Sequence, residues 1–289
     1  MKALIGWLGR ALAFVIARSP RFVRAGLAAF LAFLWYDLFR IRRQVVEGNL
    51  ALAFPDMSPK ERVRLGRKNL RHIAMNLIEY SYLPFLNKKN VYRRFRFHNE
   101  ELLQQALARG KGVLLMTLHL GNGDLACAAL ALAGYPMTMV SKFFKLQWLN
   151  DLWFKMRERL GVKFVPPRDS SFVLLRSLRQ GRAVIIPLDQ FTGPPIGVRT
   201  QFFGHETGTA AGLALMAERS GAPVLSVYTV REKDGTHGVY FMREMPVRTS
   251  PEDTPEQITQ RFNDELESFV KLHPDQWMWI HKRWKKFKY

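Results

Sequence analysis

Apolar residues occur along this chain in two patterns, as short continuous runs and as longer stretches with helical spacing. The runs predict strands at residues 112–118, 137–141, 183–188, 223–229 and 237–243. The stretches predict helices at residues 124–133, 146–160, 169–180 and 207–220. Because strands that alternate with helices form parallel sheets covered on both faces, we expect an α/β fold with a mostly parallel central sheet flanked by helices.

Two further helices are marked by their first residues. Ser58-Pro59-Lys60-Glu61 combines a capping serine, a proline at the first helical position and a glutamate three residues after the serine. Thr254-Pro255-Glu256-Gln257 opens a last amphipathic helix in the same way. No long flexible linker is visible after residue 45, so we predict one domain over residues 45–289.

The first 44 residues have a different character. Ala3 to Ala17 and Ala25 to Tyr36 are strongly apolar, but arginines interrupt them, and the longest uncharged stretch is residues 25–36. This stretch is shorter than the roughly 20 residues that cross a bilayer. We therefore expect residues 1–44 to form helices that lie in or dip into a membrane surface, with Trp7, Trp35 and Tyr36 as anchors. A soluble helical hairpin is the alternative.

Charge and the C-terminal residues point to an anionic partner. The chain has 44 Lys and Arg against 24 Asp and Glu, a net charge of +20. Residues 277–289 mix tryptophan, phenylalanine and tyrosine with lysine and arginine, which suits a membrane interface or single-stranded nucleic acid. In a third interpretation, a C-terminal helix packs its tryptophans on the core and leaves its lysines in water. The one cysteine, Cys127, allows no internal disulfide and fits a small buried residue.

The segment Leu118-His119-Leu120-Gly121-Asn122-Gly123-Asp124 directly follows an apolar run. A strand that ends in histidine, followed by a glycine turn and a carboxylate at the start of a helix, presents an imidazole that an acid can orient. We therefore predict that His119 is a general base. Ligands of such sheets bind beyond the carboxyl ends of the strands, where Asp189 and Gln190 also lie, after the run that ends at Leu188.

Other interpretations of this segment are weaker. Gly121 to Ala126 satisfies a loose dinucleotide fingerprint, but an acidic residue about 20 positions further on is missing, and Asp124 would repel a pyrophosphate. The seven histidines include no pair at metal-ligand spacing on one element, so no metal site is predicted. His119 could also be a structural histidine, and the whole chain a basic protein that binds membrane or nucleic acid without catalysis.

Several short sequence motifs, which occur in a fixed order along the chain, favour the catalytic interpretation over the structural one. His119 and Asp124 have the spacing of the glycerolipid-type acyltransferase signature, and the rest of the chain resembles the late acyltransferases of lipid A biosynthesis. The blocks that carry this resemblance are Asn49 to Pro55, Arg157-Glu158-Arg159 before Gly161, Asp189-Gln190 with Phe202-Phe203-Gly204, and Trp277 to Trp284. The chain departs from many lipid A enzymes in having aspartate, not glutamate, at position 124. Mycobacterial mannoside acyltransferases share much of this layout, so a phosphatidylinositol mannoside or a lysolipid is the alternative acceptor.

The resemblance implies transfer of a fatty acyl group from an acyl carrier protein or coenzyme A thioester to a hydroxyl of a lipid A precursor or related glycolipid. His119 would take the proton of the hydroxyl, and Asp124 would hold the imidazole tautomer and stabilise the imidazolium. The amides of the Gly121 to Gly123 turn, or Arg157 or Arg159, would bind the oxyanion. The remaining expected substrate-binding residues are Asn122, Lys142, Asp189 and Gln190.

The same resemblance implies no cofactor and no nucleic-acid partner. It implies a site on the cytoplasmic face of a bacterial inner membrane, where a phosphorylated glycolipid acceptor and an acidic carrier protein would meet the basic surface. The acyl chain needs an apolar groove, for which aromatic residues follow the motif. These are Phe143, Phe144, Trp148 and Trp153. The sequence does not fix the acceptor, the length of the acyl chain or the oligomeric state.

Overall fold

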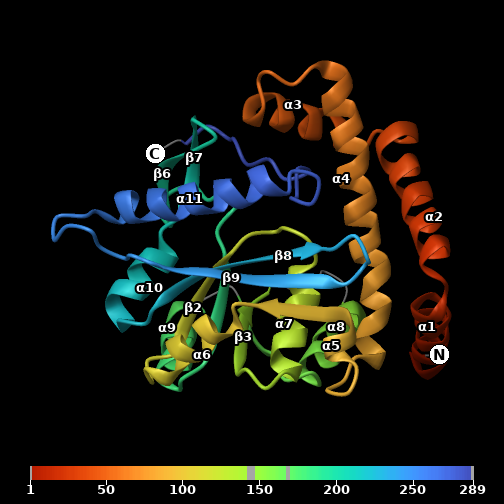
Figure 1. Ribbon diagram of the computed structural model, residues 1–289, viewed down its shortest axis with the longest axis horizontal. Coiled ribbons are helices and arrows are strands. Elements are labelled where there is room, and N and C mark those ends of the chain that lie inside the picture. The colour runs from red at the N-terminus through yellow and green to blue at the C-terminus, as the bar shows by residue number, and fades with distance from the viewer. Residues whose placement is uncertain (1, 142–146, 167–169, 288–289) are drawn as a thin grey trace.

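The computed structural model describes residues 2–141, 147–166 and 170–287, with the side chains in these ranges except those of residues 2–8, 147–149, 151 and 152. A seven-stranded sheet lies at the centre of the molecule, and helices lie on both sides of it (Figure 1). The strands of this sheet are β1 (Phe95–His98), β2 (Val113–Thr117), β3 (Met137–Val140), β4 (Lys163–Val165), β5 (Ala183–Pro187), β8 (Val224–Arg231) and β9 (His237–Met245). The expected α/β class with a mostly parallel sheet is therefore confirmed.

The strand order is β1-β9-β8-β2-β5-β3-β4, and every neighbouring pair is parallel except β8 and β9. β2 lies between β5 and β8, with Thr117 opposite Pro187 in the register. The residues that follow these two strands, from Leu118 and from Leu188, thus leave the sheet side by side.

Two hydrophobic clusters cover the two faces of the sheet, and alternate residues of β2 enter each of them. Leu114 and Met116 pack with α9 (Ser170–Arg179), α10 (Gly212–Ser220) and α11 (Pro255–Leu272). Val113 and Leu115 pack with α6 (Glu100–Ala108) and α7 (Gly123–Leu132). This burial on both faces explains why β2 is a continuous apolar run in the sequence.

The N-terminal elements stand beside the sheet (Figure 1). They are α1 (Lys2–Arg18), α2 (Arg21–Ala32), the π-helical η1 (Phe33–Leu38), α3 (Arg43–Ala53), α4 (Pro59–Glu79), the 3₁₀ element η2 (Tyr80–Phe85) and α5 (Val91–Arg94). The capping box of Ser58 and Glu61 forms at the start of α4, and that of Thr254 and Gln257 forms at the start of α11, as predicted. No single described helix is long and apolar enough to cross a membrane, although one bent pair, Arg21–Leu38 with Arg43–Ala53, passes by length and composition and turns by 90°.

Some sequence expectations are wrong. The helix predicted at 207–220 begins only at Gly212, because His205–Ala210 is strand β7, which pairs with β6 (Gly197–Phe202) in a separate antiparallel hairpin. By contrast, the helix predicted at residues 146–160 is present as α8 (Gln147–Glu158). Tyr36 is not a surface anchor: it is fully buried and donates a hydrogen bond to Glu47, at 2.9 Å. A Cβ at Gly66 would lie 2.5 Å from the Tyr36 hydroxyl, so only glycine lets α4 pack on this ring.

The tryptophans Trp277 and Trp279 of the C-terminal segment pack in the core. Trp277 and Trp279 are fully buried, while Lys282, Lys285 and Lys286 are exposed. The third interpretation of this segment is therefore confirmed for its packing, although the described residues 277–287 form no helix. Trp7, Lys142, Phe143, Phe144 and Trp148, which the sequence analysis singled out, lie outside the described side chains.

Candidate active site

His119 lies just beyond the end of β2, and its side chain is 32% exposed. Its Nδ1 lies 2.8 Å from Oδ1 of Asp189, and its backbone N–H donates to Oδ2 of the same carboxylate at 2.9 Å. Asp189 is 2% exposed and also accepts a hydrogen bond from the Trp277 indole, at 2.8 Å. The adjacency of β2 and β5 brings these two residues together at the carboxyl edge of the sheet.

The chemistry of this pair fixes the proton on the imidazole. Burial alone raises the pKa of Asp189, but the charge and hydrogen bonds of His119 and the Trp277 donor outweigh it and lower the pKa to about 2. An ionised carboxylate can only accept hydrogen bonds, so we assign the neutral ring a proton on Nδ1. Its Nε2 then keeps a lone pair, and this atom lies 3.4 Å from the side-chain nitrogen of Gln190.

Two carboxylates act on the basicity of His119. Burial lowers its pKa, but the charge and hydrogen bond of Asp189, followed by the charge of Asp124, raise the pKa above its usual value. A raised pKa makes the imidazole a stronger proton acceptor and stabilises the imidazolium once it forms. Both properties suit a proton acceptor.

Asp124 is placed differently from the expectation. The carboxylate that holds Nδ1 of His119 is Asp189, whereas Asp124 binds Arg157 at 2.6 Å and accepts from the Tyr80 hydroxyl at 3.1 Å. Burial, and then the charge of Asp124, raise the pKa of Tyr80 well above its usual value, so this hydroxyl stays a donor. Asp124 lies in the first turn of α7 and affects the imidazole through its charge.

The two candidate arginines differ. Arg157 is 2% exposed and lies over the rings of Trp153 and Phe164, at 4.9 and 4.2 Å. Its guanidinium is held by Asp124 and therefore orients this carboxylate. Arg159 donates to the carbonyl oxygens of Leu83 and Pro84, so the structure does not bring it to His119.

The glycine turn is held in place by its backbone. Gly121 has φ +59°, and a Cβ there would lie 2.3 Å from the Thr229 carbonyl oxygen, so no other residue fits. Its N–H donates to the Gln276 carbonyl at 3.2 Å and is not available to an oxyanion, contrary to the expectation. Gly123, the first residue of α7, has an N–H without an intrahelical acceptor.

Asn122 has a structural position. Its side chain is 2% exposed, caps α7 by accepting from the Leu125 N–H, and donates to Glu79 at 3.3 Å. Both the oxygen and the nitrogen of the Asn122 side chain are therefore engaged within the protein, and this side chain is not open to a substrate. Glu79 in turn forms a buried ion pair with Arg231, at 2.6 Å.

Sequence reasoning missed Trp277, Tyr80 and His281 as parts of the site. The Phe191 N–H donates to Nε2 of His281 at 3.1 Å, and burial lowers the pKa of His281 to about 4, so this ring is neutral. The block Trp277 to Trp284 contains Trp277 and His281, and one interpretation packed its tryptophans on the core, but no local pattern connected this block to Asp189.

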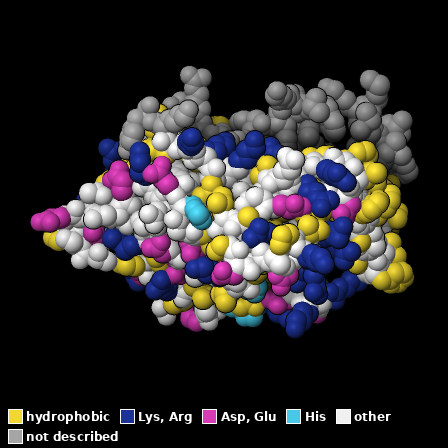
Figure 2. Space-filling model, turned by 90° about the horizontal axis from the view of Figure 1, so that it is seen from above, with side chains coloured by type: hydrophobic (Ala, Val, Ile, Leu, Met, Phe, Trp, Pro, Cys, Tyr) yellow, Lys and Arg dark blue, Asp and Glu magenta, His cyan; other side chains and the backbone are white. Residues whose placement is uncertain are grey.

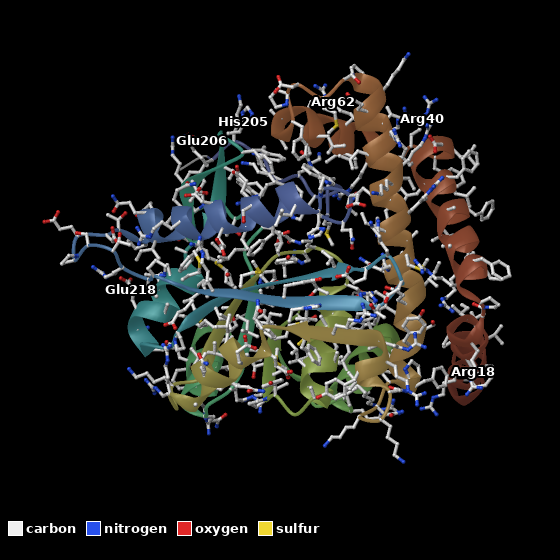
Figure 3. All side chains as sticks on the ribbon, viewed as in Figure 1. Arg18, Arg40, Arg62, His205, Glu206 and Glu218 are labelled. Carbon is white, nitrogen blue, oxygen red and sulfur yellow. The ribbon has the colours of Figure 1, made fainter. Side chains whose placement is uncertain are left out.

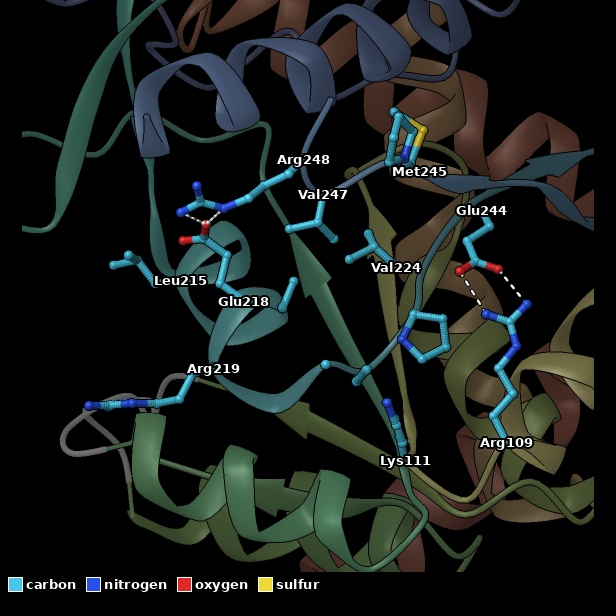
Figure 4. Close-up of a pocket in the computed structure, with 15 residues that line it drawn as sticks. Arg109, Lys111, Leu215, Glu218, Arg219, Val224, Glu244, Met245, Val247 and Arg248 are labelled. Carbon is cyan, nitrogen blue, oxygen red and sulfur yellow. Dashed lines mark hydrogen bonds and ion pairs between the residues drawn. The ribbon is translucent and has the colours of Figure 1, made fainter. Parts of the chain in front are cut away.

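A hollow among the described residues lies elsewhere (Figure 4). It has a volume of about 1280 Å³ and lies at the amino ends of β2 and β8, beside Lys111 and Val224. Its lining contains two ion pairs, Arg109 with Glu244 and Arg248 with Glu218. Because His119 follows the opposite end of β2, this hollow is not part of the candidate active site.

Comparisons with known proteins identify the family of the chain. A family of bacterial lipid A biosynthesis acyltransferases matches residues 1–286. The lipid A biosynthesis acyltransferase of Haemophilus influenzae is 28% identical over 274 residues, 95% of this chain and 85% of the relative. The lipid A biosynthesis lauroyltransferase of Escherichia coli is 26% identical over 282 residues, 96% and 90% of the two chains.

A second branch also matches. The phosphatidylinositol mannoside acyltransferase of Mycolicibacterium smegmatis is 28% identical over 222 residues, 75% of this chain and 71% of the relative. The lipid A enzymes cover more of the chain, and the family match extends over nearly all of it. The chain therefore belongs to the bacterial lipid A biosynthesis acyltransferase family, an O-acyltransferase family whose reaction transfers an acyl group from a donor to a lipid acceptor.

Proposed function

We propose that the protein transfers a fatty acyl group from an acyl carrier protein thioester to a hydroxyl of a phosphorylated lipid A precursor. The observation that carries this proposal is the pairing of His119 with ionised Asp189 at the carboxyl edge of the sheet, which leaves Nε2 unprotonated. Coenzyme A is the alternative carrier, and a phosphatidylinositol mannoside is the alternative acceptor, as in the second branch of relatives.

The reaction uses His119 twice. Its Nε2 takes the proton of the acceptor hydroxyl as the oxygen attacks the thioester carbonyl, and Asp189 and Asp124 stabilise the imidazolium. The Gly123 N–H at the start of α7 binds the oxyanion, aided by the helix dipole. When the tetrahedral intermediate collapses, the carbon–sulfur bond breaks and the imidazolium returns its proton to the leaving thiolate.

Turnover by the purified protein tests this proposal. Acyl carrier protein thioesters and coenzyme A thioesters are each offered with a lipid A precursor or with a phosphatidylinositol mannoside, and the products are separated by mass spectrometry. We expect an ester on the lipid A precursor, formed faster from the carrier protein thioester. Hydrolysis alone, or no product with any pair, would contradict the proposal.

We also propose that residues 1–44 attach the acyltransferase domain, residues 45–289, to the cytoplasmic face of the inner membrane. Apolar side chains on α2 and η1 are exposed, among them Phe22 (76%), Phe30 (57%) and Phe33 (52%). Hydrophobic side chains gather at the end of the molecule that these helices occupy, next to lysines and arginines (Figure 2). Arg18 and Arg40 border the same helices (Figure 3). This combination suits a surface of anionic lipid.

Substituting these phenylalanines tests the attachment. The variant Phe22→Ser/Phe30→Ser is expected to bind liposomes at least tenfold more weakly, because each buried phenylalanine contributes about 1.5 to 3 kcal/mol. The control is Phe172→Ser/Leu272→Ser, which removes two exposed side chains, 71% and 62% exposed, on α9 and α11. Flotation measures both. Equal losses in the two variants would contradict a membrane role for α2.

A further inference from the structure

A small arginine-rich pocket lies where α2, the end of α4, α5 and the turn between β8 and β9 meet. Its volume is about 190 Å³, below the roughly 300 to 1,000 Å³ of sites for drug-sized ligands, so it can admit a small polar group but not an acyl chain. Five arginines contribute to its wall. They are Arg21, Arg24, Arg93, Arg94 and Arg231.

The charge of this pocket is not balanced by its own carboxylates. Glu79 is engaged by Arg231 through two hydrogen bonds of 2.8 and 2.6 Å. Asp234 is engaged by Arg96, which does not line the pocket, at 2.5 Å. Among the described residues, the other four arginines of the pocket have no carboxylate partner. Their positive charge is therefore available to an anion.

Neighbouring residues hold two of these arginines in place. The guanidinium of Arg94 lies 3.8 Å from the ring centre of Tyr82, which is itself 7% exposed. Arg21 donates to the Lys233 carbonyl. The Arg21 side chain also packs closely on Gly235, where an added Cβ would lie 3.2 Å from the Nε of Arg21. Guanidinium groups that are already oriented lose less rotamer freedom when they bind a ligand.

The surroundings indicate where the anion comes from. Between Arg21 and Arg24, the same turn of α2 carries Phe22 and Val23, 76% and 44% exposed, so apolar side chains adjoin the cationic pocket. Guanidinium groups bind phosphate oxygens in pairs, through a planar fork of donors. We propose that this pocket binds the phosphate group of a membrane lipid, whose acyl chains then lie along the exposed face of α2.

Vesicle binding tests the pocket without requiring turnover. The variant Arg93→Gln/Arg94→Gln is made in a His119→Ala background and floated with phosphatidylcholine vesicles that contain phosphatidic acid. We expect at least a tenfold loss of affinity, with partial recovery when Arg94→Lys restores a charge without the fork. The control, Arg176→Gln/Arg179→Gln, removes the same charge from exposed positions on α9, away from α2, and is expected to lose less than twofold.

Two further measurements distinguish the sources of the phosphate. If the pocket holds the phosphate of the acceptor, the double variant with His119 intact raises KM for the acceptor in phospholipid-free detergent and leaves vesicle binding unchanged. If it holds a bulk phospholipid, vesicle binding falls and KM does not change. The proposal would be overturned if the double variant matched the control in both vesicle binding and KM. It would also be overturned if the pocket bound inorganic phosphate but no lipid phosphate. Because vesicle binding is read without acyl transfer, failure of the proposed function would not be confused with failure of the pocket.

Discussion

Replacing His119 by alanine is expected to lower the rate of acyl transfer by about 100- to 10,000-fold, the usual contribution of a general base. The fold should survive, because Asp189 keeps the His119 backbone N–H and the Trp277 indole as donors. Acyl transfer by the purified variant measures the first effect, and circular dichroism with thermal unfolding measures the second. A folded variant with near-normal turnover would contradict the assignment of His119 as the base.

The wild-type rate should also depend on pH in a defined direction. The pKa of His119 is raised, so its neutral, basic form appears only above that raised value, and kcat/KM should rise with pH through it. The alanine variant should lack this acidic limb. A limb that persists unchanged in the variant would have to belong to another group.

The second large effect is expected for Asp189→Asn, with a loss of about 10,000-fold, as for the buried aspartate of a serine protease triad. The amide can donate to Nδ1 and so place the imidazole proton on Nε2, where it blocks proton abstraction. Removing the charge of Asp189, the stronger of the two carboxylate effects on His119, also lowers the pKa of this residue, so the acidic limb should move to lower pH. Measuring kcat/KM across the pH range tests both expectations.

Asp124→Asn is the matched comparison, because Asp124 affects the imidazole through charge and not through Nδ1. It should move the acidic limb in the same direction, but by less than Asp189→Asn does. Asparagine is preferred to alanine here, since it retains an acceptor for the buried guanidinium of Arg157. If Asp124→Asn removed the activity and Asp189→Asn did not, the roles of the two carboxylates would have to be exchanged.

The fold was most predictable where burial leaves a simple pattern. β2 and β5 are covered on both faces, so each is a continuous apolar run. β4 has only three residues, which is too short for a pattern. The hairpin of β6 and β7 was missed because Thr207, Gly208 and Thr209 lack the strong alternation of a strand, and only tertiary packing selects their conformation.

Some members of the candidate site could be predicted from the sequence, but Trp277, Tyr80, His281 and several contacts could not. His119 and Asp189 could each be placed at a strand end, but their hydrogen bond depends on β5 lying beside β2, and strand order is set by long-range packing. For the same reason, the spacing of His119 and Asp124 suggested the wrong partner for Nδ1. Trp277 lies 88 residues from Asp189, and no local pattern connects them.

The C-terminal segment that supports Asp189 has a consequence for synthesis on the ribosome. Gln276 accepts the hydrogen bond of Gly121, Met278 donates to the carbonyl of His119, and Arg283 donates to that of Gln190. A nascent chain that still lacks these residues contains His119, Asp124 and Asp189 but not the hydrogen-bond partners that hold the segments around His119 and Asp189 in place. We therefore expect the candidate active site to assemble only after nearly the whole chain has been translated, so that a growing polypeptide would not transfer acyl groups while it is still being made.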